Sequence, residues 1–175
     1  MSIEKILDIS LPFPFITSLI LFGLEGKHLE NTMGGFRLGL ISFISGVAIG
    51  CFITHLMFKS RCCRGFDAIT KLFFSIAIIV TAALFGVTSA SWINRSFGAP
   101  IDYSVAYTVV DRAVIPSRKR KAPSGGYLYL KVNTKEERIK VSYDFWQRAS
   151  EGTPIVLTLR RGLLGYPFII KYEQG

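Results

Sequence analysis

An uncharged run, Leu72–Asn94, constrains this chain more than any other feature. A helix over this run is about 34 Å long, which exceeds the roughly 30 Å hydrocarbon core of a bilayer. Large apolar residues fall on every side of such a helix, so no polar stripe is left to face water. The alternative, a buried core helix, needs more surrounding protein than 175 residues supply. We therefore expect a membrane span over 72–93.

Two further apolar runs lie upstream and predict two more spans, at about 38–58 and about 6–24. The first of the three runs is the shortest, and it contains two prolines, which cannot donate helical hydrogen bonds. For that run, an interfacial helix is the alternative to a span. The prediction is a membrane α-helical N-terminal part over 1–94 with three transmembrane helices.

The charges of the connecting loops predict the orientation. The connection 59–71 carries four basic residues against one acidic residue, whereas the connection 25–37 is balanced. Lys and Arg accumulate in cytoplasmic loops, so 59–71 belongs in the cytoplasm and the C-terminal part lies periplasmic or extracellular. Cysteine usage agrees, because Cys62 and Cys63 fall in the cytoplasmic connection. The exported part has no cysteine and cannot use an internal disulfide.

Small residues recur at every fourth position in the second and third predicted spans. The members of these stripes are Ser42, Gly46, Gly50, Ala82, Gly86 and Ala90. Such stripes let helix backbones approach closely in lipid, so we expect these two spans to pack against each other. A seam between two copies, giving a homo-oligomer, is the alternative. Neither span contains Asp, Glu, Lys or Arg, which argues against an ion or proton pathway.

The sequence changes character after the third run, where alternation replaces continuous apolarity. Four stretches alternate in side-chain character, 103–110, 127–134, 138–143 and 154–160, and a fifth candidate strand, 166–172, closes the chain. Period-two patterns predict strands with one buried face. Before the fourth stretch, we expect one helical turn with Asp144 as its N-cap and Gly152 at its end. The prediction is a small, mainly antiparallel β domain of about five strands over 103–175, joined by a linker at 95–102.

Three stretches of this predicted domain carry a resemblance: "VVDRAV", "YLYLKV" and "RIKVSYDFWQRASEGTPIVLTLRRGLLGY". Together they resemble the β domain of uncharacterised bacterial multi-pass membrane proteins. In those proteins, a strand pair precedes a "G-x-x-V/I-x-L" strand and a glycine-rich turn. The resemblance implies the architecture and a place in the bacterial inner or plasma membrane. It implies no activity.

Residues that usually carry catalysis or bind metals are sparse. The two histidines, His28 and His55, fall on opposite predicted faces of the membrane and cannot share a site. Glu25, His28 and Glu30 form one compact group of potential metal ligands, which we interpret as a solvated loop. The β domain lacks histidine, so no Ser/His/Asp arrangement can form there. The sequence predicts no catalytic residues, no metal and no cofactor.

Positive charge is the remaining clue to function. From Asn94 onward the chain has fourteen Lys and Arg against seven Asp and Glu. Such a surface favours anionic lipid headgroups, anionic envelope polymers or an acidic protein face, and a merely solvated loop is the alternative. Export disfavours nucleic acid as a partner. The candidate interaction surface consists of basic and aromatic residues: Arg118, Lys119, Arg120, Lys121, Tyr127, Tyr129, Trp146, Arg160 and Arg161.

These observations predict a non-catalytic integral membrane protein. We expect its basic β domain to interact with a protein partner or with membrane lipid outside the cytoplasm. Two alternatives are a toxin-immunity protein of the envelope and an accessory subunit of a transporter, channel or secretion complex.

Overall fold

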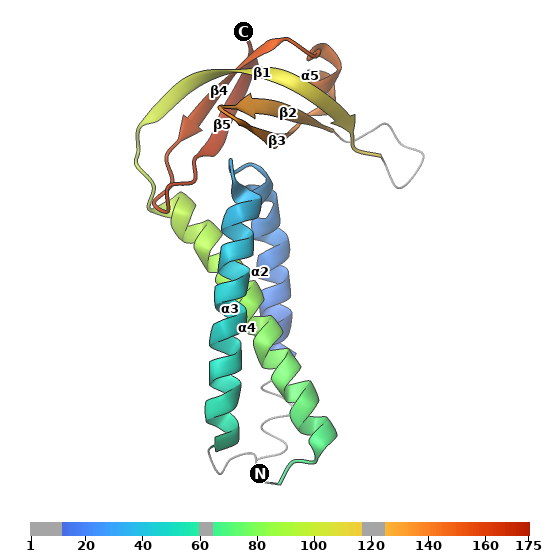
Figure 1. The fold of residues 1–175 in the computed structure, drawn as a ribbon, viewed down its shortest axis with the longest axis vertical. Coiled ribbons are helices and arrows are strands. Elements are labelled where there is room, and N and C mark those ends of the chain that lie inside the picture. The colour runs from blue at the N-terminus through green and yellow to red at the C-terminus, as the bar shows by residue number, and fades with distance from the viewer. Residues whose placement is uncertain (1–11, 60–64, 117–124) are drawn as a thin grey trace. The chain divides into compact units, whose positions relative to one another are not determined.

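The computed structural model describes residues 12–59, 65–116 and 125–175 (Figure 1). The helices are α2 (Pro12–Glu30), α3 (Gly35–Lys59), α4 (Ala68–Ser96) and α5 (Tyr143–Arg148). The strands are β1 (Asp102–Val114), β2 (Gly126–Val132), β3 (Lys135–Val141), β4 (Pro154–Arg160) and β5 (Phe168–Gln174). Internal contacts divide the chain into a helical unit, Met1–Lys27 with Phe36–Trp92, and a β unit, His28–Gly35 with Ile93–Gly175.

Two helices in the described part of the chain, α3 and α4, are long and apolar enough to cross a membrane. They have 25 and 29 residues, and only 17% and 22% of their most apolar stretches are buried. The core helix of a soluble protein is mostly buried, whereas these helices expose large apolar side chains such as Phe52 and Phe73. Their surfaces are therefore suited to lipid.

Helix α2 occupies the region of the first predicted span. It has 19 residues, and it is not among the described helices that combine the length and hydropathy of a span. The predicted span begins at about residue 6, and residues 1–11 lie outside the described part of the chain. The structure thus confirms a helical N-terminal part with two span-capable helices, and the third span stays a prediction.

The five strands form one antiparallel sheet in the order β3-β2-β1-β4-β5, which confirms the predicted β architecture. Strand β1 has 13 residues and pairs with two neighbours, β4 along Asp102–Thr108 and β2 along Val109–Val114. The register shifts between Val109 and Asp111, where β1 changes partner. Irregularities of this kind bend a strand, and Figure 1 shows β1 as a long curved strand.

Alternate residues of the strands form the core of the β unit. Its strand members are each at most 4% exposed: Val109, Leu128, Leu130, Ile139, Val141, Ile155, Leu157 and Leu159. Phe145 of α5 completes one side of this cluster. Met33, in the turn between α2 and α3, belongs to the same cluster although it is far away in sequence. The turn 28–35 is therefore part of the β unit.

The short helix α5 differs from its prediction at both ends. Ser142, not Asp144, is the N-cap, and its hydroxyl accepts a hydrogen bond from the Phe145 N–H at 3.4 Å. Asp144 instead lies in the first turn, where its charge favours the helix N-terminus. The helix ends at Arg148. Gly152, with φ of +80°, forms the later turn into β4 and donates its N–H to the Val109 carbonyl at 2.9 Å.

Candidate functional site

The basic run Arg118–Lys121, the densest part of the predicted interaction surface, lies outside the described residues. Its flanking strands are described. The Ile115 N–H donates to the Gly125 carbonyl at 3.1 Å, and Val114 pairs with Gly126. The ends of the β1–β2 connection are therefore held together by the sheet.

Arg160 and Arg161 have different surroundings. The Arg160 guanidinium forms a two-pronged ion pair with Asp102, at 2.6 Å from Nε to Oδ1 and 3.0 Å from Nη2 to Oδ2. This hydrogen bonding lowers the pKa of Asp102 and raises the pKa of Arg160. Arg161 is exposed, and its carbonyl accepts from the Ala99 N–H at 2.9 Å. Of the two cations, Arg160 is thus neutralised by a cross-strand partner.

Tyr127 and Tyr129 lie on one face of β2. They alternate with the core residues Leu128 and Leu130, so they face away from the core. The guanidinium of Arg138, on β3, lies over the Tyr127 ring at 4.4 Å from its centroid. This stacking leaves a half-buried, basic and aromatic strip on the outer face of the β2–β3 hairpin.

Trp146 lies on the opposite face of β2 from the two tyrosines. Its indole packs against the core and fills the space that a side chain on Gly126 would need. It stacks on Tyr143 with 5.8 Å between centroids, and Arg112 covers it at 4.9 Å. The structure therefore does not bring Trp146 together with Tyr127 and Tyr129 in one surface.

The turn between α2 and α3 connects to both edge strands of the sheet. On the β3 side, Lys140 Nζ lies 2.7 Å from Glu30 Oε2, and the Gly34 N–H donates to Glu137 Oε2 at 3.1 Å. The hydrogen bond that Lys140 donates to Glu30 raises the pKa of Lys140.

On the β5 side, the Met33 N–H donates to the Pro167 carbonyl at 2.8 Å. The Ile169 N–H donates to the Asn31 carbonyl at 2.9 Å. Backbone groups of an edge strand that lack a neighbouring strand need such partners, and the turn supplies them.

Both carboxylates of the group of potential metal ligands have other partners in the structure. Glu30 pairs with Lys140, whereas Glu25 accepts a hydrogen bond from the Ser91 hydroxyl at 3.1 Å. No group of three or more His, Cys, Asp or Glu in the described residues could hold a metal ion.

The contacts of Asn94, like those of the turn 28–35, were not predicted from the sequence. It is 1% exposed and lies near the end of α4. Its side-chain amide donates to the Tyr166 carbonyl at 2.8 Å and accepts from the Leu164 N–H at 3.0 Å. Its own backbone carbonyl accepts from the Leu163 N–H at 3.0 Å. Asn94 thus fixes the β4–β5 loop through three hydrogen bonds.

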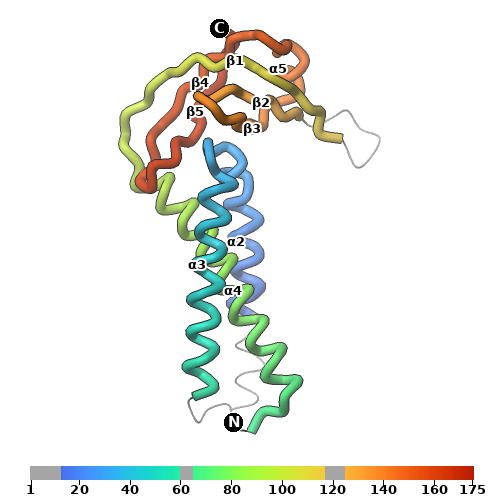
Figure 2. The backbone as a smooth tube through the Cα atoms, in the orientation of Figure 1, coloured from blue at the N-terminus to red at the C-terminus, as the bar shows by residue number. Residues whose placement is uncertain are grey.

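The small-residue stripes of α3 and α4 lie at the contact between these helices, which cross in Figure 2. A Cβ at Gly46 would lie 2.6 Å from the Ala82 carbonyl oxygen, and one at Gly50 would lie 2.7 Å from the Ile79 Cα. A Cβ at Gly86 would lie 3.0 Å from the Ser42 carbonyl oxygen. Backbones this close leave no room for larger residues. Ala90, the last member of the stripe, is half-buried.

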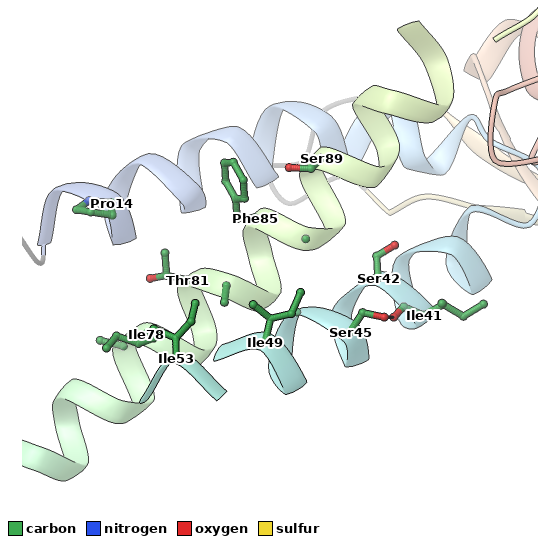
Figure 3. Close-up of a pocket in the computed structure, with 14 residues that line it drawn as sticks. Pro14, Ile41, Ser42, Ser45, Ile49, Ile53, Ile78, Thr81, Phe85 and Ser89 are labelled. Atoms are coloured by element: carbon green, nitrogen blue, oxygen red, sulfur yellow. Dashed lines mark hydrogen bonds between the residues drawn. The ribbon is translucent and has the colours of Figure 1, made fainter. Parts of the chain in front are cut away.

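A groove of about 660 Å³ lies beside this contact within the helical unit (Figure 3). Residues of α3 and α4 form most of its walls, and α2 contributes Pro14. The larger side chains that line it are Ile41, Ile49, Ile53, Ile78 and Phe85. Its polar groups are hydroxyls, such as those of Ser45 and Thr81.

Comparison of the chain with protein-family models, with curated proteins and with solved structures finds no match.

Proposed function

We propose that this chain is a multi-pass membrane protein that presents a basic, non-catalytic β unit outside the cytoplasm. One observation carries this proposal: α3 begins, and α4 ends, with residues of the same β unit. A helical hairpin that crosses a bilayer twice returns to the side from which it started. The turn 28–35 and the sheet then lie on one side, and the connection between α3 and α4 lies on the other.

The charges of the connecting segments indicate which side of the membrane each part faces. Within 59–71, four basic residues face one acidic residue, and this excess favours the cytoplasm. The β unit therefore lies outside, in the periplasm or the extracellular space. Helix α2 ends inside the β unit at Glu30, so a span by α2 would place its N-terminal end on the cytoplasmic side, and without such a span only that end would change sides. The proposal keeps the predicted span by α2 because few polar side chains interrupt the first apolar run.

A reporter enzyme tests this orientation. A phosphatase that is active only outside the cytoplasm is fused after Gly175 and, separately, after Gly65. We expect activity from the first fusion alone, and immunoblots check that both fusions are present in equal amounts. Activity from the fusion after Gly65 alone would reverse the orientation. Activity from neither fusion would contradict an exported β unit.

The proposed role of the β unit is to bind an anionic surface or an acidic protein partner. Among the described residues, Lys131, Lys135 and Arg161 are exposed cations of this unit. They add to the basic run Arg118–Lys121. Cations near an anionic membrane contribute about 1 kcal/mol each within a Debye length, so the binding should weaken as salt rises.

The test of binding uses the full chain, because the β unit includes the turn 28–35 and is not continuous in sequence. The protein is placed in nanodiscs of neutral phosphatidylcholine and mixed with vesicles that contain phosphatidylglycerol. Replacing residues 118–121 with Ser should abolish most co-flotation. The control Lys171→Ser removes a cation that already pairs with Glu173 and should change little. Equal flotation with neutral vesicles, or no effect of the fourfold replacement, would contradict an anionic ligand.

A further inference from the structure

The β4–β5 loop carries two leucines at the tip of a tight turn. The Gly165 N–H donates to the Gly162 carbonyl at 3.0 Å, so Leu163 and Leu164 are the two central residues of a β-turn. Their side chains are 58% and 45% exposed. The central positions of turns usually hold Gly, Pro, Asn, Asp or Ser. Two adjacent, exposed leucines there indicate that the tip of this turn contacts something other than water.

Exposed apolar side chains also lie on the segment that follows α4 and pairs with this loop. The Ala99 N–H donates to the Arg161 carbonyl at 2.9 Å, which holds the two segments together. Phe97 and Ile101, on either side of that contact, are 58% and 72% exposed. A group of exposed apolar side chains marks a site of interaction with a membrane or a protein. We call the four residues of this group the apolar end: Phe97, Ile101, Leu163 and Leu164.

The apolar end lies where α4 enters the β unit. The last residues of α4, from Ile93 onward, belong to this unit, and the chain passes from them into β1. Asp102, the first residue of β1, pairs with Arg160 at the end of β4. Arg160 in turn pairs with Phe168, the first residue of β5. Three strand ends therefore meet beside the end of α4, as Figure 1 shows.

Hydrogen bonds fix the turn at the level of Asn94. The backbone carbonyl of Asn94 accepts from the Leu163 N–H at 3.0 Å, and its side-chain oxygen accepts from the Leu164 N–H at 3.0 Å. Asn94 is the last residue of the uncharged run Leu72–Asn94, which as a helix is about 34 Å long. The hydrocarbon core of a bilayer is roughly 30 Å thick. When α4 spans the membrane, Asn94 lies close to the boundary between hydrocarbon and headgroups, and the turn bonded to it lies at the same depth.

The charges around the apolar end suit the same boundary. Arg161 directly precedes the turn and is exposed. A long Arg side chain can place its charge among headgroup phosphates while its apolar neighbours lie deeper. Neither segment, 94–101 or 161–168, contains an acidic residue that would oppose this contact. A soluble partner cannot occupy a surface at the depth of the hydrocarbon boundary, whereas lipid is already present there around α4.

We propose that the turn at Leu163 and Leu164 enters the membrane leaflet at the C-terminal end of α4, so that the β unit contacts lipid through its apolar end. The proposal rests on the membrane insertion of α4 proposed above. It goes beyond that insertion because it assigns a second lipid contact to a loop almost seventy residues after the span. It also differs from the proposed binding by the basic run, since it involves the chain's own bilayer and apolar side chains.

Fluorescence quenching by lipid tests this proposal in the full chain. The native cysteines are replaced, and a dye is attached to a single cysteine in place of Leu163, Glu151 or Ile76. The protein is reconstituted in phosphatidylcholine nanodiscs with and without lipid that carries a nitroxide near the top of one acyl chain. Glu151 is exposed in the turn before β4, about 23 Å from the β4–β5 loop along that strand. Ile76, 49% exposed on α4, reports the insertion of the helix. We expect quenching at Leu163 to be several-fold stronger than at Glu151 and similar to that at Ile76.

A charge in the turn should withdraw it from the leaflet. Leu164→Asp should lower the quenching of the dye at position 163 to the level at Glu151, because a carboxylate is excluded from hydrocarbon. The turn is bonded to Asn94 through backbone N–H groups, so this substitution leaves those bonds in place. Val114→Asp, at the far end of β1, is the matched control. Val114 is 44% exposed, against 45% for Leu164, and its substitution should leave the quenching unchanged.

Three results would overturn the proposal. The first is quenching at Leu163 that is no stronger than at Glu151 although Ile76 is quenched, and this result would leave the insertion of α4 intact. The second is quenching at Leu163 that Leu164→Asp does not reduce. The third is a dye at Leu163 that lipid does not quench but that is shielded from aqueous iodide, which would assign the apolar end to a contact with a second copy. Absence of quenching at Ile76 would instead contradict the insertion of α4, and with it this proposal.

Discussion

The side-chain amide of Asn94 donates a hydrogen bond to the carbonyl oxygen of Tyr166 at 2.8 Å. It joins the end of α4 to the β4–β5 loop within the β unit. Because Asn94 is 1% exposed, its own amide has no solvent to replace a lost partner. Gly162 faces the amide so closely that a Cβ there would overlap it.

Replacing Asn94 with Leu should destabilise the β unit. The substitution removes the partner of the Tyr166 carbonyl and of the Leu164 N–H, and because both bonds are part-buried the total cost should be about 1–3 kcal/mol. Thermal unfolding of the full chain in detergent, followed by circular dichroism, measures the loss. Ser96→Leu, at an exposed position two residues later, is the control. Equal melting of the two variants would mean that the Asn94 bonds do not hold the loop.

A substitution in the α2–α3 turn should also weaken the β sheet. Met33 is 7% exposed and packs in the β core, so Met33→Ala should cost about 2–5 kcal/mol. Limited proteolysis within the β unit measures the effect directly. Phe36→Ala, three residues away at a position that is 83% exposed, should leave cleavage unchanged. Unchanged cleavage of Met33→Ala would show that the turn does not stabilise the β unit.

The ion pair of Asp102 with Arg160 predicts part of the acid sensitivity of the β unit. The pKa of Asp102 lies below its ordinary value of 3.8, so the pair contributes stability above that pH. This contribution is lost as the pH falls through the lowered pKa. The parent protein should therefore lose more stability than Asp102→Asn between about pH 5 and pH 2. Glu151→Gln, at an exposed carboxylate, serves as control. Parallel pH profiles of parent and Asp102→Asn would contradict the role of the pair.

Leu at Gly46 or Gly50 should push α3 and α4 apart. A Cβ at either position already lies within 2.7 Å of the facing backbone, so a full side chain cannot be accommodated. The melting temperature in detergent should fall by several degrees. Gly23→Leu is a matched control on α2, because nothing lies within 4 Å of a Cβ there. If all three variants had the melting temperature of the parent, the result would contradict a close contact between α3 and α4.

The sequence predicted the elements whose pattern is local. Alternation placed Leu128 and Ile155 in the core, and continuous apolarity located α3 and α4. The predicted N-cap of α5 was wrong. The side chains of Ser142 and Asp144 both suit that position, and the path of the chain decides between them.

The long-range contacts could not be predicted from such patterns. Met33 lies in a mostly polar turn, and nothing near it in sequence indicates contact with strands that begin almost seventy residues later. Asn94 looked like the end of a span, yet its partners lie in a loop that only the fold brings near. Charge alone placed Arg160 in the candidate interaction surface, and only the strand register places Asp102 opposite it.

The orientation of the α3–α4 hairpin is the central claim, and cysteine labelling tests it most directly. In a variant without native cysteines, single cysteines replace Asn31 in the turn, Glu136 on β3 and Gly65 in the connection between α3 and α4. A membrane-impermeant maleimide is applied to intact bacterial cells. We expect labelling at positions 31 and 136, and labelling at position 65 only after permeabilisation. Labelling at position 65 in intact cells, or at only one of the other two positions, would contradict this orientation of the hairpin.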